Sequence, residues 1–303
     1  MRKQVFLLFL FGLFVCEIRA QFTDENADDY GGLEAGINVG AYFANSYMAN
    51  FYNGANNEDG YNSADRIIDN VHYLNRINDV LEQNGYRYPL EDGLYETEYP
   101  GSMKYTPAIY AGLTGRYWFN RKTAVSVSMN YSKLYTRDNF VIYNTNPDIP
   151  PSNRENLYVI GTIVGVEERV NIDIGLANSF PIHERANFII EYGLNINNTA
   201  ALENKIEIYG LILDIQYKGP YDYIPGGNTP QYNFTQKGIG YGGYLSPGIQ
   251  LNFTQDISVD VVSQIYYNYT NIAFDSSQER LNYSHWGLQF APYVRFNFTR
   301  LFF

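Results

Sequence analysis

The stretch "WGLQFAPYVRFNF" near the end of the chain alternates between apolar and other residues, and this alternation limits what the chain can fold into. Its apolar positions are Trp286, Leu288, Phe290, Pro292, Val294, Phe296 and Phe298. The positions between them carry Gly287, Gln289, Ala291, Tyr293, Arg295 and Asn297. Because successive side chains of a strand point to opposite faces, this segment is predicted to be a β-strand that separates two different environments.

The same period of two recurs along the chain. Five further segments alternate clearly, and their apolar phases begin at Leu33, Thr123, Val170, Phe188 and Ile257. Two more segments, about 106–119 and 239–254, follow the rule less regularly. The aromatic content of 17%, which includes 30 tyrosines, favours strands over helices. The sequence therefore predicts eight strands, each with one apolar face and one polar or small face.

The connections between these segments alternate between short and long. The short ones are tight polar turns at residues 120–122, 183–185 and 254–256. The long ones cover about 47–104, 144–155, 201–236 and 274–282. Transmembrane barrels combine short periplasmic turns with long extracellular loops in this way. We therefore predict an all-β protein, a transmembrane up-and-down antiparallel β-barrel of about eight strands.

The N-terminus has the features of a secretory signal peptide. Two basic residues precede an apolar run from Val5 to Val15, and Ala20 supplies a small residue for cleavage. We therefore predict a signal peptide over residues 1–20 and a mature barrel over residues 21–303. Cys16 is the one cysteine of the chain, so the mature protein is predicted to have no disulfide.

The leader, the eight alternating segments, the ordering of the loops and the terminal Phe303 together resemble the eight-stranded outer-membrane barrel family, the OmpA and OmpX type. The resemblance covers nearly all of the mature chain. It implies export to the outer membrane and contact with outer-membrane lipid. In that family the terminal aromatic residue usually shares the lipid-facing phase, whereas here Phe302 is in that phase and Phe303 is not.

If the apolar phase faces lipid, the other phase of every strand points into the barrel. Its charged members are predicted to be Glu34, Arg116, Asp173, Glu191, Asp260 and Arg295. On the lipid side, a charge near the midplane would cost roughly 2–4 kcal/mol. The lumen of an eight-stranded barrel is only wide enough for side chains to fill, so we expect these six residues to form one bridged network that plugs it. A conducting or proton-relay role is the alternative.

The first long connection, residues 47–104, is predicted to be an extracellular insertion that contains a helix at about 63–84. Apolar residues recur there at helical spacing, and Gly85 suits the helix end. We expect a contact stripe made by Ile67, Val71, Leu74 and Leu81. The stripe packs either on the barrel rim or on another protein.

Three functions are compatible with this fold. The first is a non-enzymatic barrel, structural or accessory to an envelope assembly, secretion or surface complex, with a protein partner at its extracellular loops. The second is a small transport or ligand-binding barrel. The third is a lipid-modifying enzyme, for which Ser284 and His285, with Glu279 nearby, are a weak signal. No cofactor or metal motif occurs, and the net charge of −11 argues against nucleic acid as a partner.

Overall fold

The computed structural model describes residues 32–55, 62–120, 122–150, 157–216, 236–254, 256–275 and 280–299. The signal peptide over residues 1–20 and the two terminal phenylalanines lie outside these ranges, and what we expect of them stays a prediction. No helix among the described residues is both long and apolar enough to cross a membrane.

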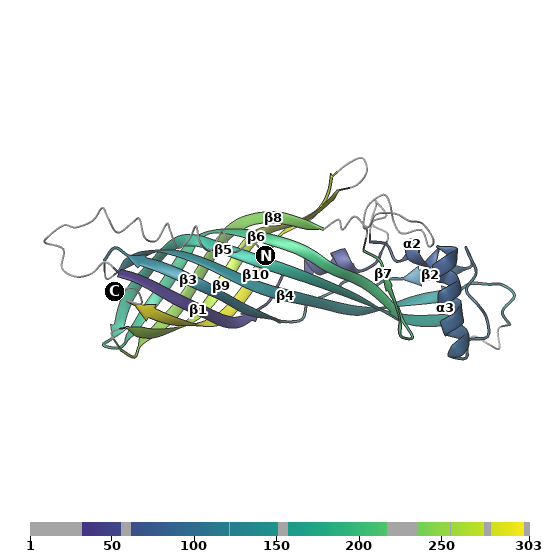
Figure 1. Cartoon of the computed structure of the whole chain (residues 1–303), viewed down its shortest axis with the longest axis horizontal. Helices are drawn as coiled ribbons and strands as arrows, with labels where there is room; N and C mark the ends of the chain where they lie inside the picture. The colour runs from purple at the N-terminus through teal and green to yellow at the C-terminus, as the bar shows by residue number, and fades with distance from the viewer. Residues whose placement is uncertain are drawn as a thin grey trace, which may run out of the picture.

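Eight antiparallel strands close into one barrel, as the sequence predicts (Figure 1). Each strand pairs with the next in the order β1, β3, β4, β5, β6, β8, β9 and β10, and β10 pairs back with β1. These strands are β1 (Gly32–Tyr42), β3 (Ala108–Trp118), β4 (Thr123–Asn144), β5 (Tyr158–His183), β6 (Ala186–Ile208), β8 (Lys237–Asn252), β9 (Ile257–Asp275) and β10 (Arg280–Thr299). A closed ring pairs backbone groups between strands, which a lipid environment requires.

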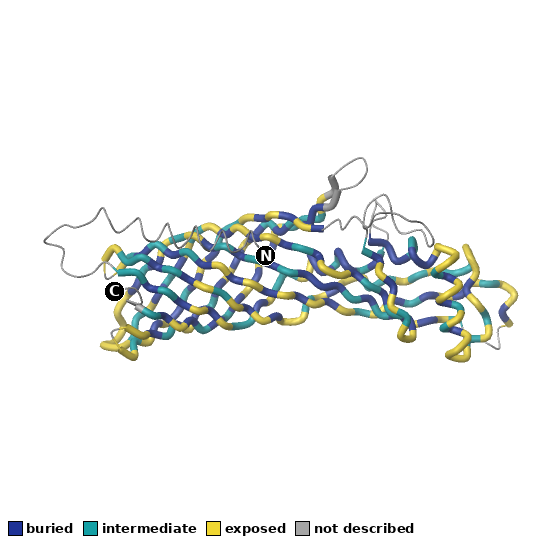
Figure 2. The backbone as a smooth tube through the Cα atoms, viewed as in Figure 1, coloured by how far each residue is buried: buried dark blue, intermediate teal, exposed yellow. Residues whose placement is uncertain are grey.

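The predicted facing of the strands is confirmed. Large apolar side chains lie on the exterior, where Ile109 is 76%, Leu194 72% and Leu288 66% exposed. The alternate positions are buried inside the barrel, and Figure 2 shows this alternation of buried and exposed residues along the strands. The apolar side chains therefore face the lipid and the polar ones face the lumen.

The three predicted short turns join β3 to β4, β5 to β6 and β8 to β9. The strands differ greatly in length, however. Strands β1 and β3 have 11 residues each, whereas β4 has 22, β5 has 26 and β6 has 23. A tilted strand crosses a bilayer with about 9–11 residues. Strands β4, β5 and β6 therefore continue well beyond the membrane, and the predicted loop at 201–236 begins as strand up to Ile208.

We call the part beyond the membrane the extracellular module, after the side of the membrane that the sequence predicts for it. Its sheet consists of residues 133–144 of β4, 158–168 of β5 and 200–208 of β6, flanked by β2 (Tyr95–Glu98) on β4 and β7 (Leu211–Asp214) on β6. The 3₁₀ helix η2 (Ser46–Tyr52) and the α-helices α2 (Asp65–Ile68) and α3 (Val71–Gln83) belong to it as well. Figure 1 shows α2, α3, β2 and β7 together at the end of the long strands.

The module has an apolar core of its own. From the helices it contains Ile67, Ile68, Leu74, Ile77 and Leu81. These side chains pack in one cluster with residues of the sheet, including Phe140, Ile142, Val159, Ile163, Ile206, Ile208 and Leu213. Because isolated short helices are marginal in water, this packing supplies most of the stability of α2 and α3.

The prediction of one continuous helix over about 63–84 is wrong in detail. The segment forms two helices, and the break falls at Asp69 and Asn70. The backbone of Asn70 is extended, and its side chain accepts a hydrogen bond from the amide of His72 at 3.0 Å. Asparagine is a strong N-cap because its side chain satisfies a free amide of the first turn. The predicted stop is correct, since Gly85 follows α3 with a φ of +88°.

Candidate functional site

The half of the lumen farther from the extracellular module holds a network of buried charges, which we call the lower ion network. It consists of Glu34, Arg116, Glu191, Asp260 and Arg295. Arg116 lies at its centre and contacts Glu34 at 2.6 Å, Asp260 at 2.6 Å and also Glu191. Each of the five side chains is at most 7% exposed. Five of the six charged residues expected in the lumen are therefore in contact across strands β1, β3, β6, β9 and β10.

Arg295 joins this network from the last strand. Its guanidinium contacts Glu191 at 2.5 Å and Asp260 at 3.5 Å. It also donates to the hydroxyl of Tyr293 at 2.6 Å and to the side-chain oxygen of Asn38 at 2.8 Å. A buried charge is tolerated only when it is paired and its remaining hydrogen bonds are satisfied. The arginine in the middle of the C-terminal strand is thus accommodated by the lumen.

The expectation that Asp173 joins the same network is wrong. Asp173 is 1% exposed, but no arginine among the described residues forms an ion pair with it. Its carboxylate accepts hydrogen bonds from neutral donors instead, namely Asn130, Asn195, Gln264 and Tyr266, at 2.6–3.3 Å. Its cross-strand neighbours on β4 and β6 are Ser128 and Asn195, so amides and hydroxyls surround it. The two arginines reach Glu191 and Asp260, which lie on other strands.

A second ion pair lies near the extracellular end of the lumen and was not expected from the sequence. Arg169 of β5 donates to Glu167, and both side chains are at most 1% exposed. Glu167 also accepts from the hydroxyls of Tyr52 at 3.1 Å and Tyr105 at 2.5 Å. On its other side Arg169 donates to Gln289 at 2.9 Å. Residues of β5, β10, η2 and the segment before β3 are joined here, and they close the mouth of the barrel.

Tyrosines fill the space between the two charged regions. The fully buried side chains of Tyr42, Tyr110 and Tyr266 lie in one cluster with the buried Tyr293 and Tyr244. The centroid of the Tyr110 ring lies 6.0 Å from that of Tyr42 and 5.4 Å from that of Tyr293. The Tyr110 and Tyr266 hydroxyls are 2.8 Å apart. The lumen is therefore occupied by side chains from the lower ion network up to η2.

The sequence carried a signal for these unexpected residues. Glu167 and Arg169 have the same parity as Asp173, which was expected to point inward, so extending that strand toward the N-terminus would have placed both in the lumen. Tyr42 continues the inward phase of Glu34 in the same manner. The alternation does not give the position of each residue along the barrel axis, and this position decides which charges pair.

The predicted stripe on the loop helix packs inside the protein. Ile67, Leu74 and Leu81 are 7%, 5% and 1% exposed and belong to the core of the module. Val71 is 71% exposed, so its inclusion in the stripe is wrong. Because Asn70 restarts the helix, Val71 becomes the first residue of α3 and points to solvent, while Ile68 and Ile77 take buried positions. The stripe therefore stabilises the module and is not available to a partner.

Hydrogen bonds to two carboxylates hold the edge strand β2 against α2. Asp65 accepts from Thr97 at 2.6 Å and from Tyr99 at 2.5 Å, and Asp69 accepts from Tyr95. Burial, followed by the hydrogen bond to Asp65, raises the pKa of Tyr99. Burial and the hydrogen bond to Asp69 raise the pKa of Tyr95 in the same way. Both phenols therefore stay protonated and able to donate at neutral pH.

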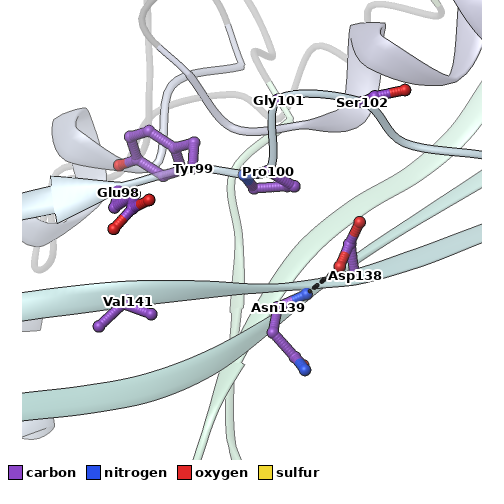
Figure 3. A pocket seen from close by; sticks show the side chains of 8 residues that line it. All are labelled: Glu98, Tyr99, Pro100, Gly101, Ser102, Asp138, Asn139 and Val141. Carbon is purple, nitrogen blue, oxygen red and sulfur yellow. Dashed lines mark hydrogen bonds between the residues drawn. The ribbon is translucent and has the colours of Figure 1, made fainter.

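A shallow depression of about 300 Å³ lies where β2 ends (Figure 3). Its lining includes Glu98, Tyr99, Pro100, Asp138 and Asn139. The two carboxylates already have donors, since Glu98 accepts from the hydroxyl of Tyr143 at 3.0 Å and Asp138 from the amide of Asn139 at 2.9 Å. Across the described residues, no group of three or more His, Cys, Asp or Glu side chains is placed to hold a metal ion.

The residues of the enzymatic alternative are only partly described. Glu279 lies outside the described residues. The ring of His285 stacks on Tyr47, with 3.9 Å between the centroids and 21° between the planes. A histidine stacked in this way contributes to packing at the barrel mouth.

The closed ring of eight antiparallel strands, with its apolar exterior, defines the fold. The fold is that of an eight-stranded outer-membrane β-barrel. No protein-family model matches the chain, and no curated protein matches its sequence. Solved structures similar to it include Neisserial surface protein A (NspA), with a TM-score of 0.41, 8% identity and coverage of 88% of this chain and 96% of that one.

Two further similar structures are outer membrane proteins. OprG from Pseudomonas aeruginosa has a TM-score of 0.40 and 7% identity, and the match covers 89% of this chain and 97% of OprG. AlkL, determined in lipid bilayers, has a TM-score of 0.36 and 9% identity, with coverage of 93% and 96%. At such identities the likeness concerns the fold alone, and the assignment depends on the ring of strands described above.

Proposed function

We propose that this protein is a closed, non-enzymatic barrel of the outer membrane that holds the extracellular module at the cell surface as a contact platform for other envelope proteins. It would be a structural or accessory subunit of an assembly, secretion or surface complex. One observation carries the proposal. The lumen is filled with buried side chains, whereas three strands continue outward and build a module with its own core.

The filled lumen argues against the transport alternative. A conducting barrel needs a continuous aqueous path, yet side chains of the lower ion network, the tyrosine cluster and the Arg169–Glu167 pair occupy successive levels here. Opening a path would require buried charges to separate, which costs roughly 3–5 kcal/mol for each broken pair.

The module supports the display role because it has a packed core of its own and the ring of strands closes without its helices. Its helices are fixed by apolar packing, and β2 is fixed by hydrogen bonds to Asp65 and Asp69. Its outer sheet face exposes apolar side chains that the helices do not cover, including Tyr143, Tyr158 and Ile160. Exposed apolar and aromatic side chains on a rigid surface are typical of protein contact sites.

Conductance recordings test the closed barrel. The wild-type protein in planar bilayers should show no steady conductance. The double variant Tyr110→Ala/Tyr266→Ala removes two rings from the lumen but leaves the charged levels on both sides in place, so it should stay closed as well. Steady conductance of the wild type at the level of a water-filled porin recorded in the same bilayers would refute the closed barrel and favour transport.

Cross-linking in intact cells tests the platform. A photo-reactive residue at Tyr143 or Ile160 should form discrete adducts with another protein. The same residue at Leu194, on the lipid-facing wall, should give none and serves as the control. If the module positions form no more protein adducts than Leu194 does, the platform role is wrong even when the barrel is closed.

A further inference from the structure

Three exposed cationic side chains lie on the outer face of the sheet, where β4 leaves the membrane. Lys133 and Arg137 lie four residues apart on that face of β4, with Tyr135 between them. The third is Lys104, on the segment before β3. We call Lys104, Lys133 and Arg137 the basic triplet.

The position of Lys104 follows from the backbone around it. Tyr105 forms a bridge with Thr136, and the amide of Thr106 donates to the carbonyl of Tyr135 at 2.9 Å. The hydroxyl of Tyr105 points inward to Glu167. Because neighbouring residues of an extended segment face opposite sides, exposed Lys104 faces outward and stands opposite Arg137.

The side chains of Lys104, Lys133 and Arg137 form no ion pair with any described carboxylate. Glu168 is the cross-strand neighbour of Lys133, but it accepts a hydrogen bond from Tyr131 at 2.8 Å, and the Lys133 ammonium lies 5.5 Å from the ring centroid of Tyr135. Like charges opposite each other destabilise a sheet, so Lys104 and Arg137 lower the stability of this edge unless an anion binds them.

The height of the basic triplet is that of the lipid headgroups. A strand that starts at Thr123 has crossed the bilayer after about 9–11 residues, which places the boundary near Lys133. Tyr131 and Tyr135 flank Lys133 on the same outer face. Tyrosines of lipid-facing walls gather at the level of the headgroups.

We infer that the basic triplet binds the phosphate of an anionic lipid headgroup in the outer leaflet. Arginine binds phosphate oxygens with two parallel hydrogen bonds, and lysine adds a point charge. The charge distribution fits this occupant, because the exposed carboxylates of Glu96 and Glu98 lie on β2, farther from the membrane. The flanking tyrosines favour a lipid over a soluble phosphate compound, since their apolar rings favour the interface with lipid.

Binding of lipid A, a diphosphorylated glycolipid, to the purified full-length mature protein tests this site. The triple variant Lys104→Gln/Lys133→Gln/Arg137→Gln should bind it roughly 100-fold more weakly, at about fivefold for each charge removed near the surface. The matched control is Lys205→Gln, because exposed Lys205 is already paired with Glu203 at 2.8 Å, and it should bind like the wild type. The charge-preserving variant Lys104→Arg/Lys133→Arg should also retain binding.

Three results would overturn the inference. The first is equal binding by the triple variant, and the second is an equal loss in Lys205→Gln. The third is equal binding of lipid A from which the phosphates have been removed. Competition by inorganic phosphate at millimolar concentration would assign the site to a soluble anion and so also reject the lipid. If the triple variant fails to give the folded, heat-modifiable band, the single variant Arg137→Gln is tested instead. It should bind lipid A about fivefold more weakly, and unchanged binding would overturn the inference.

Discussion

The membrane part of β4 and its part in the extracellular module use the same strand in opposite ways. Within the membrane its inward side chains are polar, with Ser126, Ser128, Asn130 and Ser132 buried. Beyond the membrane the inward side chains include apolar ones, with Leu134, Phe140 and Ile142 buried, although Thr136 is buried as well. On the outward face Val125, Val127 and Met129 give way to a mixed surface, in which Lys133, Arg137 and Asn139 alternate with Tyr135, Val141 and Tyr143.

The side chains of β4 change along the strand because its exterior contacts lipid in the bilayer and water beyond it. In the bilayer the exterior contacts hydrocarbon, so the apolar face must point outward and the polar residues must satisfy one another inside. Above the bilayer the exterior contacts water, and the module needs a buried apolar core like any soluble domain. On β6 a bulge assists the change, because a register shift opposite Val166 and Glu167 lets Ile206 and Ile208 face inward.

The largest effect that this comparison predicts is in the barrel. Arg295→Leu should lower the free energy of unfolding by roughly 3–5 kcal/mol, because it leaves buried Glu191 and Asp260 with one arginine fewer. Urea-induced loss of the faster-migrating unboiled band on gels measures this. The matched control Arg137→Leu changes the same residue type on the outer face of the module and should shift stability by about 0.5 kcal/mol or less. Equal effects of the two variants would refute a stabilising role for the lower ion network.

In the module the corresponding loss comes from apolar packing. Ile77→Ala should destabilise the module by about 2–5 kcal/mol, since Ile77 is fully buried in its core. Val71→Ala removes a similar side chain from an exposed position and should cost about 0.5 kcal/mol or less. Limited proteolysis between residues 62 and 85 reports on the module, while the heat-modifiable band reports on the barrel.

Ile77→Ala should therefore accelerate cleavage and leave the heat-modifiable band unchanged. A joint loss of both signals would show that the barrel and the module unfold as one unit. Equal cleavage of the Val71 and Ile77 variants would show that the helix packs differently from the arrangement described here.

The sequence was sufficient for the barrel because each strand there obeys one rule, apolar outside and polar inside. That rule predicted eight strands, their facing and the parity of their connections. It could not predict the module, because the rule reverses near Lys133 and the bulge shifts the phase of β6. The inward facing of Asp173 follows from parity, but its partners depend on relative heights across strands, which one sequence does not contain. The break at Asn70 was missed because apolar spacing continues across it while the cap ends one helix and starts another.

A smaller loss of module stability is expected from weakening the hydrogen bonds that hold β2 against α2. Asp65→Asn keeps an acceptor for Thr97 and Tyr99 but removes its charge, which should cost the module about 1–2 kcal/mol. Proteolysis at β2 and α2 should rise accordingly. Asp79→Asn, on the exposed side of α3, removes the same charge without such donors and should have no measurable effect. An equal rise in both variants would assign the change to overall charge.

The same contacts predict the smallest effect, a loss of module stability confined to alkaline pH. Burial and the bonds to Asp65 and Asp69 raise the folded-state pKa of Tyr99 and Tyr95, whereas an unfolded tyrosine has a pKa of about 10. A group whose pKa is raised by folding contributes stability that is complete below the unfolded pKa and is lost as the pH rises toward the folded one. Protease resistance of the module should therefore be constant from pH 7 to about 10 and fall above it. In Tyr95→Phe/Tyr99→Phe the resistance should be lower at pH 7, and its alkaline fall should be weaker because these phenols no longer titrate. A decline that starts between pH 7 and 9 would require another titrating group and would reject this assignment.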